Sequence, residues 1–308
     1  MARSRLLKLL LQLCLLLLLG YFLLPVLLDS IKQFDPAQWQ INYPLLIGSL
    51  LLMQIVLYCQ SAIWSLIIRF FDKRVTFNKA FRIAYLAQLG RYLPGKVWQL
   101  FGMIYLAGKE GIKKEQATLS FILSQFFTTP PGILVVILYL FAINPAPQYQ
   151  PYTELAWIGW LVVAGFLVVY FWPGLFKRLV NRLIRLLRQP TVEFRLEKKL
   201  GLQVLLAYFV TWNLYGLAFY LFIKALLPEQ ELPLIEVVGA WTLAYLVGYW
   251  TVVLPAGIGA REAVLLLLLT PIFSSLGTPE LAGVAVVGAR AWSIIGEIIC
   301  TLLAWRVK

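Results

Sequence analysis

Pro94 and Gly95 interrupt an apolar region, and they stand between two cations, Arg91 and Lys96. Proline ends the helix before it, and glycine lets the chain reverse without a steric clash. The helix that follows therefore begins with unbonded backbone N–H groups and partial positive charge, which suits an anion. The chemistry expected here is binding of a phosphate or carboxylate head group rather than binding of a cation.

A second interruption has the same ingredients, because Pro255, Gly257 and Gly259 lead directly into Arg261 and Glu262. A charge inside hydrocarbon costs several kcal/mol unless it is paired or hydrated, so charged residues in apolar segments are candidate functional residues. We expect this pair to contact a lipid head group. The alternative stays open that both side chains only pair with neighbouring helices and hold the fold.

The last apolar segment carries Arg290 and Glu297. Seven positions place both side chains on one helix face, but about 10.5 Å apart, which is too far for direct contact in a straight helix. Each therefore needs another partner, and Arg261 and Glu262 are candidates. All four residues are expected to take part in head-group binding.

Uncharged polar residues in the segment 117–141 complete the set of candidates. Ser124, Gln125 and Thr128 either line the same cavity or form hydrogen bonds between helices. The chain has no histidine, which removes the commonest general base and zinc ligand. Neither a cofactor nor a metal is expected, and no catalytic residue is assigned.

Composition places these residues in a membrane protein. The chain of 308 residues is 61% hydrophobic and 13% charged, against about 25% charged residues in soluble domains. Segments of about 20 apolar residues are long enough to cross a bilayer. We expect an all-α polytopic protein, one integral membrane domain over residues 1–308, with six full spans at 6–28, 45–68, 117–141, 155–172, 202–227 and 281–305.

Most of the 27 Lys and Arg residues fall between these spans on one side, if both termini are cytoplasmic. The net charge of +13 thus reflects membrane orientation, and no nucleic-acid partner is expected. For this charge pattern to hold, regions 80–108 and 234–273 must each begin and end on the same side of the membrane. They do so either as re-entrant hairpins or as pairs of crossings. Because the arm expected at 263–273 is only about 17 Å long, re-entrant hairpins are favoured.

The two halves, 1–143 and 144–308, have the same order of elements. Ala84–Tyr85–Leu86 precedes the first break and Ala244–Tyr245–Leu246 precedes the second. Three crossings per half make the second repeat inverted relative to the first, an architecture typical of transporters. Residues 174–188 alternate apolar and basic positions and predict an amphipathic helix at the cytoplasmic surface of the second repeat.

The motifs Leu93–Gly95, Gly111–Ile112 and Leu254–Glu262 resemble the lysylphosphatidylglycerol synthase transmembrane family, over essentially the whole chain. The resemblance implies a flippase-like bundle in the cell membrane that handles polar lipids, with Arg261 and Glu262 as the matched functional pair. It also suggests a stand-alone member, because the aminoacyl-transferase domain of the full synthases is not in this sequence.

We expect a lipid translocator that binds a phospholipid or another polar lipid, rather than an enzyme. Two alternatives remain at this point. One is a membrane-embedded lipid-modifying transferase, for which the buried acids would be Glu262 and Glu297. The other is an accessory scaffold for a partner lipid-synthesis enzyme.

Overall fold

The computed structural model describes residues 41–71, 73–92, 97–142, 150, 153–154, 156–186, 194–251, 254, 257–279 and 281–307, and these residues form helices and connecting turns. The span expected at 6–28 lies outside the described residues. So do the hairpin residues Pro94, Gly95, Lys96 and Pro255.

Four described helices are long and apolar enough to cross a membrane. They are α2 (Tyr43–Ile68, extended by η2, Arg69–Phe71), α5 (Lys114–Val136, extended by η4, Ile137–Ala142), α8 (Lys198–Leu226) and α11 (Leu281–Arg306). These helices coincide with four of the six expected spans, so the prediction of an all-helical, polytopic membrane protein is confirmed.

The span expected at 155–172 corresponds to α6 (Ala156–Phe171), which is only 16 residues long. It is followed by α7 (Pro173–Leu186), and the two helices are bent by 106°. Pro173 is the first residue of α7. Proline is favoured at this position because the backbone N–H that it lacks would have no partner within the helix. Phe176 and Val180 of α7 pack into the bundle, whereas Lys177 and Arg178 are exposed.

The first hairpin, called hairpin 1, consists of α3 (Phe77–Gln88), η3 (Leu89–Tyr92) and α4 (Val97–Lys109). Gly90 allows the two arms to meet, since a Cβ there would lie 2.5 Å from the backbone of Trp98. At 1.5 Å per residue the helical arms are about 18 and 20 Å long, shorter than a hydrocarbon core of about 30 Å.

The second hairpin, called hairpin 2, consists of α9 (Leu234–Trp250) and α10 (Ala260–Ser275). At its turn Gly257 has φ 68°, and a Cβ on it would lie 2.4 Å from the carbonyl oxygen of Gly248. The expected short arm at 263–273 is wrong: α10 has 16 residues, because it starts at Ala260 and ends at Ser275. At 1.5 Å per residue α10 is about 24 Å long. Re-entry of hairpin 2 was predicted because the arm was expected to be short, and the greater length of α10 weakens that argument.

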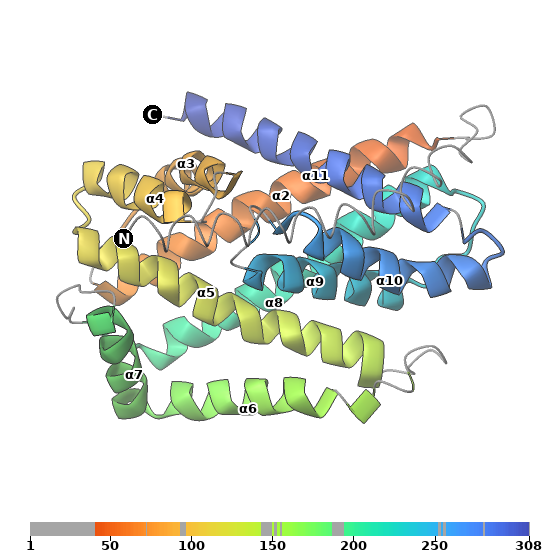
Figure 1. Ribbon diagram of the computed structural model, residues 1–308. Helices are drawn as coiled ribbons and strands as arrows, with labels where there is room; N and C mark the ends of the chain where they lie inside the picture. Colours follow the sequence, from red (N-terminus) through yellow and green to blue (C-terminus); the bar gives the residue numbers. More distant parts are fainter. Residues whose placement is uncertain are drawn as a thin grey trace, which may run out of the picture.

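The hairpins join the bundle at opposite ends (Figure 1). Hairpin 1 connects α2 to α5 at the end where α11 finishes, and hairpin 2 connects α8 to α11 at the other end. Helix α8 packs against α2, α5 and α9, and α11 packs against both α3 and α10. The tips of the two hairpins therefore meet the same small set of long helices within the bundle.

Candidate functional site

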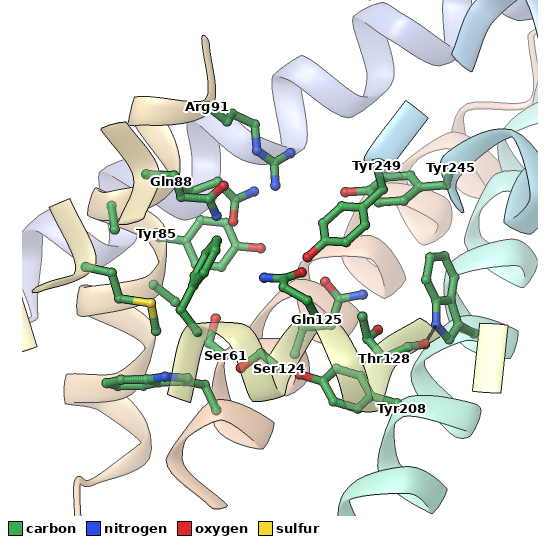
Figure 2. A pocket seen from close by; sticks show the side chains of 18 residues that line it. Ser61, Tyr85, Gln88, Arg91, Ser124, Gln125, Thr128, Tyr208, Tyr245 and Tyr249 are labelled. Atoms are coloured by element: carbon green, nitrogen blue, oxygen red, sulfur yellow. Dashed lines mark hydrogen bonds between the residues drawn. The ribbon is translucent and has the colours of Figure 1, made fainter. Parts of the chain in front are cut away.

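A cavity of ≈ 130 Å³ lies between the two hairpins and three long helices (Figure 2). Its wall is drawn from α2, hairpin 1, α5, α8 and α9. The lining residues are Gln60, Ser61, Trp64, Ala84, Tyr85, Ala87, Gln88, Arg91, Gln99, Met103, Phe121, Ser124, Gln125, Thr128, Tyr208, Trp212, Tyr245 and Tyr249.

The cavity wall combines polar and apolar groups and is almost uncharged over its described residues. Among the described residues that line it, Arg91 alone carries a charge. Figure 2 shows Gln125 reaching from α5 toward Tyr249, with the guanidinium of Arg91 pointing toward the same space. Carboxamides and hydroxyls supply most of the remaining hydrogen-bonding groups, and both kinds of group donate and accept.

Arg91 at the tip of hairpin 1 is anchored to α11. Its Nη1 donates a hydrogen bond to Oε1 of Glu297 at 2.9 Å, and the side chains are only 18% and 11% exposed. A pair this little exposed to water is screened less than a surface pair. The contact joins hairpin 1 to α11 and balances the charge of Arg91, the one cation among the described residues of the wall.

Glu262 at the start of α10 has two roles within the protein. Its Oε2 accepts a hydrogen bond from the backbone N–H of Gly259 at 2.7 Å, which satisfies a free donor at the helix start. Its Oε1 accepts from Nη1 of Arg290 at 3.3 Å. The carboxylate thus caps the start of α10 and joins hairpin 2 to α11, and Glu262 is one of the two partners that the sequence predicted for Arg290.

Arg261 is enclosed by protein groups and is only 7% exposed. Its guanidinium carbon lies 4.2 Å from the ring centre of Trp241 and 4.7 Å from that of Tyr245. Its Nη2 donates to Oγ of Ser293 on α11 at 2.9 Å. The close approach of a desolvated guanidinium to aromatic rings stabilises its charge, so the surroundings of Arg261 are supplied by Trp241, Tyr245 and Ser293 of the protein itself.

The structure divides the candidate residues into two groups. Arg91, Ser124, Gln125 and Thr128 line the cavity. The second group does not belong to the cavity wall: it consists of Arg261 and Glu262 at the start of α10 and of Arg290 and Glu297 on α11. Gly257 and Gly259 shape the turn of hairpin 2, and Gly259 has φ 86°.

Sequence reasoning did not propose several cavity residues, among them Gln60, Gln88 and Tyr249. One signal for them was present in the internal repeat. The tyrosines of the two matched triplets, Tyr85 and Tyr245, both line the cavity, one from each hairpin. Within the described part of the chain, no cluster of His, Cys, Asp and Glu side chains could hold a metal ion.

Long apolar helices around a partly buried polar cavity define an integral membrane protein. The chain belongs to the family described as lysylphosphatidylglycerol synthase TM region, whose model matches residues 6–303. The family expected from the sequence motifs is therefore confirmed, and with it a function related to membrane lipids. No curated protein and no solved structure matched the chain.

Proposed function

We propose that the protein is a flippase-like lipid translocator, which binds a polar lipid head group in the cavity between the hairpins while the acyl chains stay in the bilayer. The observation that carries the proposal is the cavity itself, whose wall contains residues of both hairpins as well as α2, α5 and α8. A partly polar cavity within an apolar bundle gives a head group hydrogen-bonding partners during its passage. No catalytic step is assigned to the protein.

In this proposal the charged residues have two kinds of role. Arg91 contacts the head group directly because it lines the cavity. Glu297 balances the charge of Arg91. The remaining three, Arg261, Glu262 and Arg290, position the tip of hairpin 2 on α11. Lys96 lies outside the described residues, and its expected contact with the head group stays a prediction from the sequence.

The hairpins act in this proposal as re-entrant elements of two inverted repeats in the cell membrane, with both termini in the cytoplasm. Their attachment at opposite ends of the bundle supports this arrangement. So does the excess of Lys and Arg in the segments that join the helices at the end where hairpin 1 is attached. Motion of one repeat against the other would open the cavity to each leaflet in turn.

The arrangement of the acids favours transport over catalysis. A general base must reach the proton that it removes. A transferase would use Glu262 or Glu297. The carboxylate of Glu262 accepts hydrogen bonds from Gly259 and Arg290, and that of Glu297 accepts one from Arg91. A partner lipid-synthesis enzyme is compatible with the proposal, as a source of the lipid that is moved.

A leaflet-resolved assay tests the function. The purified protein is reconstituted into vesicles with fluorescent lipids carrying anionic, zwitterionic or neutral heads, and exchange between leaflets is followed by chemical quenching. We expect protein-dependent exchange of at least one lipid, and its loss on Arg91→Ala. Arg182→Ala, at an exposed position on α7, is the matched control. Exchange no faster than in protein-free vesicles for every lipid would contradict the proposal.

A further inference from the structure

The hydrogen-bonding groups of the cavity match hydroxyl groups better than ions. The wall offers the carboxamides of Gln60, Gln88, Gln99 and Gln125, together with tyrosine, serine and threonine hydroxyls. The carboxamides and the tyrosine hydroxyls can both donate and accept a hydrogen bond, and so can the hydroxyl of a sugar. The hydroxyls of Ser61 and Ser124 donate to backbone carbonyls of their own helices, so they offer acceptors only. A phosphate at neutral pH mainly accepts, and an ammonium only donates, so neither uses such a wall fully.

The charge balance leads to the same conclusion. The guanidinium of Arg91 is 2.9 Å from the carboxylate of Glu297, which neutralises the one cation on the described wall. No carboxylate belongs to the described lining residues, so an aminoacyl ammonium would find no counter-ion there. A neutral head group needs no counter-ion.

Gln125 gives an independent sign of a missing partner. Its Oε1 is buried, and it accepts no hydrogen bond from any described residue. A buried acceptor without a donor is unfavourable, and native proteins satisfy such atoms with water or with a ligand. Gln125 extends into the cavity beside Tyr249 and opposite Arg91, so a donor that enters the cavity can reach it (Figure 2).

The volume of the cavity is close to that of cavities that hold one six-membered ring. A cavity of about 150 Å³ accommodates benzene, and the cavity here measures ≈ 130 Å³. Tyr208, Tyr245 and Tyr249 add flat aromatic surfaces to the wall, against which the C–H groups of a ring can pack.

We propose that the cavity binds a neutral sugar ring, carried as the head group of a glycolipid. The inference rests on the proposed lipid translocation and names its substrate class. Gln125 accepts a hydrogen bond from a sugar hydroxyl, and Gln88 and Gln99 of hairpin 1 bind the other side of the ring. Arg91 donates to a ring hydroxyl or to the oxygen that links the sugar to the lipid.

The test compares three fluorescent lipids in vesicles that contain the protein: glucosyl-diacylglycerol, phosphatidylglycerol and lysyl-phosphatidylglycerol. We expect exchange of the glucosyl lipid to be about tenfold faster than exchange of either charged lipid, the effect of one or two well-placed hydrogen bonds. Gln125→Met should slow glucosyl exchange about fivefold or more. Because Oε1 has no partner within the described protein, this variant loses no described hydrogen bond and should fold.

Gln203→Met, at an exposed position on α8, is the matched control and should leave exchange unchanged. Exchange of the charged lipids without the glucosyl lipid would overturn the sugar assignment and leave lipid translocation standing. Exchange of no lipid would overturn both. Binding of soluble methyl glucoside to the wild type, lost in Gln125→Met but without glucosyl-lipid exchange, would support the sugar site and overturn the lipid as its carrier.

Discussion

Arg91 and Glu297 are 206 positions apart in the sequence, and their side chains form a hydrogen-bonded ion pair at 2.9 Å. The contact joins the tip of hairpin 1 to the last long helix. The same helix holds hairpin 2 through Arg290 and Glu262 at 3.3 Å and through Ser293 and Arg261 at 2.9 Å. Helix α11 is thus a common support for both hairpins, which makes it the element through which their positions are coupled.

The Arg91–Glu297 pair should make a measurable contribution to stability. Removing one partner leaves the other charge in a mostly buried site, so Arg91→Met and Glu297→Gln should each lower the free energy of unfolding by about 2–3 kcal/mol. In a double-mutant cycle the coupling energy should be about 1–3 kcal/mol. Thermal unfolding in detergent measures these changes. Additive effects of the two single substitutions would show that the pair does not act as a unit.

Position 261 should require a guanidinium group, and a positive charge alone should not be sufficient there. Lysine cannot reproduce planar stacking on Trp241 and Tyr245 together with the bond to Ser293. We expect Arg261→Lys to lower the unfolding free energy by about 2 kcal/mol. Arg182→Lys, on the exposed side of α7, should change it by less than about 0.5 kcal/mol.

Ligand binding by the Arg261→Lys variant distinguishes two roles for Arg261: positioning hairpin 2 and contacting the ligand directly. Because Arg261 does not line the cavity, the fraction of Arg261→Lys that remains folded should bind a cavity ligand with unchanged affinity. Titration of labelled lipid into folded protein measures this. A weakened affinity in the folded fraction would place Arg261 among the ligands after all.

The general architecture could be predicted because it depends on short-range signals. Long apolar runs predict α2, α5, α8 and α11, and the proline–glycine breaks expected at 94–95 and 255–257 fall between the two helices of each hairpin. Helix periodicity also showed that Arg290 and Glu297 could not pair with each other. The start of α10 was placed too late because the carboxylate of Glu262 caps it through Gly259, a contact that spacing alone does not reveal.

The cavity could not be predicted in full, because its members come together only through tertiary packing. Gln60 and Tyr249 lie in helices α2 and α9, nearly 200 positions apart, and nothing local distinguishes them from residues that face lipid. The sequence-based prediction that Arg261 contacts the head group is limited for the same reason, because the surroundings of Arg261 arise only through tertiary packing. A buried arginine indicates a special environment, but the sequence does not tell whether aromatic rings or a ligand supply it.

The turn of hairpin 2 should depend strictly on Gly257. Its φ of 68° is unfavourable for other residues, and a Cβ would lie 2.4 Å from the carbonyl oxygen of Gly248. Gly257→Ala should therefore lower the unfolding free energy by about 2 kcal/mol or more. Gly108→Ala in α4 is the control, because its Cβ would meet nothing within 4 Å and alanine favours the helix by up to about 1 kcal/mol. Thermal unfolding of the two variants should shift in opposite directions.

The orientation of the bundle is the last prediction. With the three native cysteines replaced, single cysteines are introduced for the exposed residues Arg74, Lys113, Glu229 and Ser275. The first two flank hairpin 1 and the last two flank hairpin 2, so a membrane-impermeant thiol reagent should distinguish the pairs. Because basic residues are retained in the cytoplasm, positions 229 and 275 should react in intact cells, and 74 and 113 only after permeabilisation. Reaction of 74 but not 113 in intact cells would show that hairpin 1 does not return to its own side, and the inverted-repeat arrangement would then be wrong.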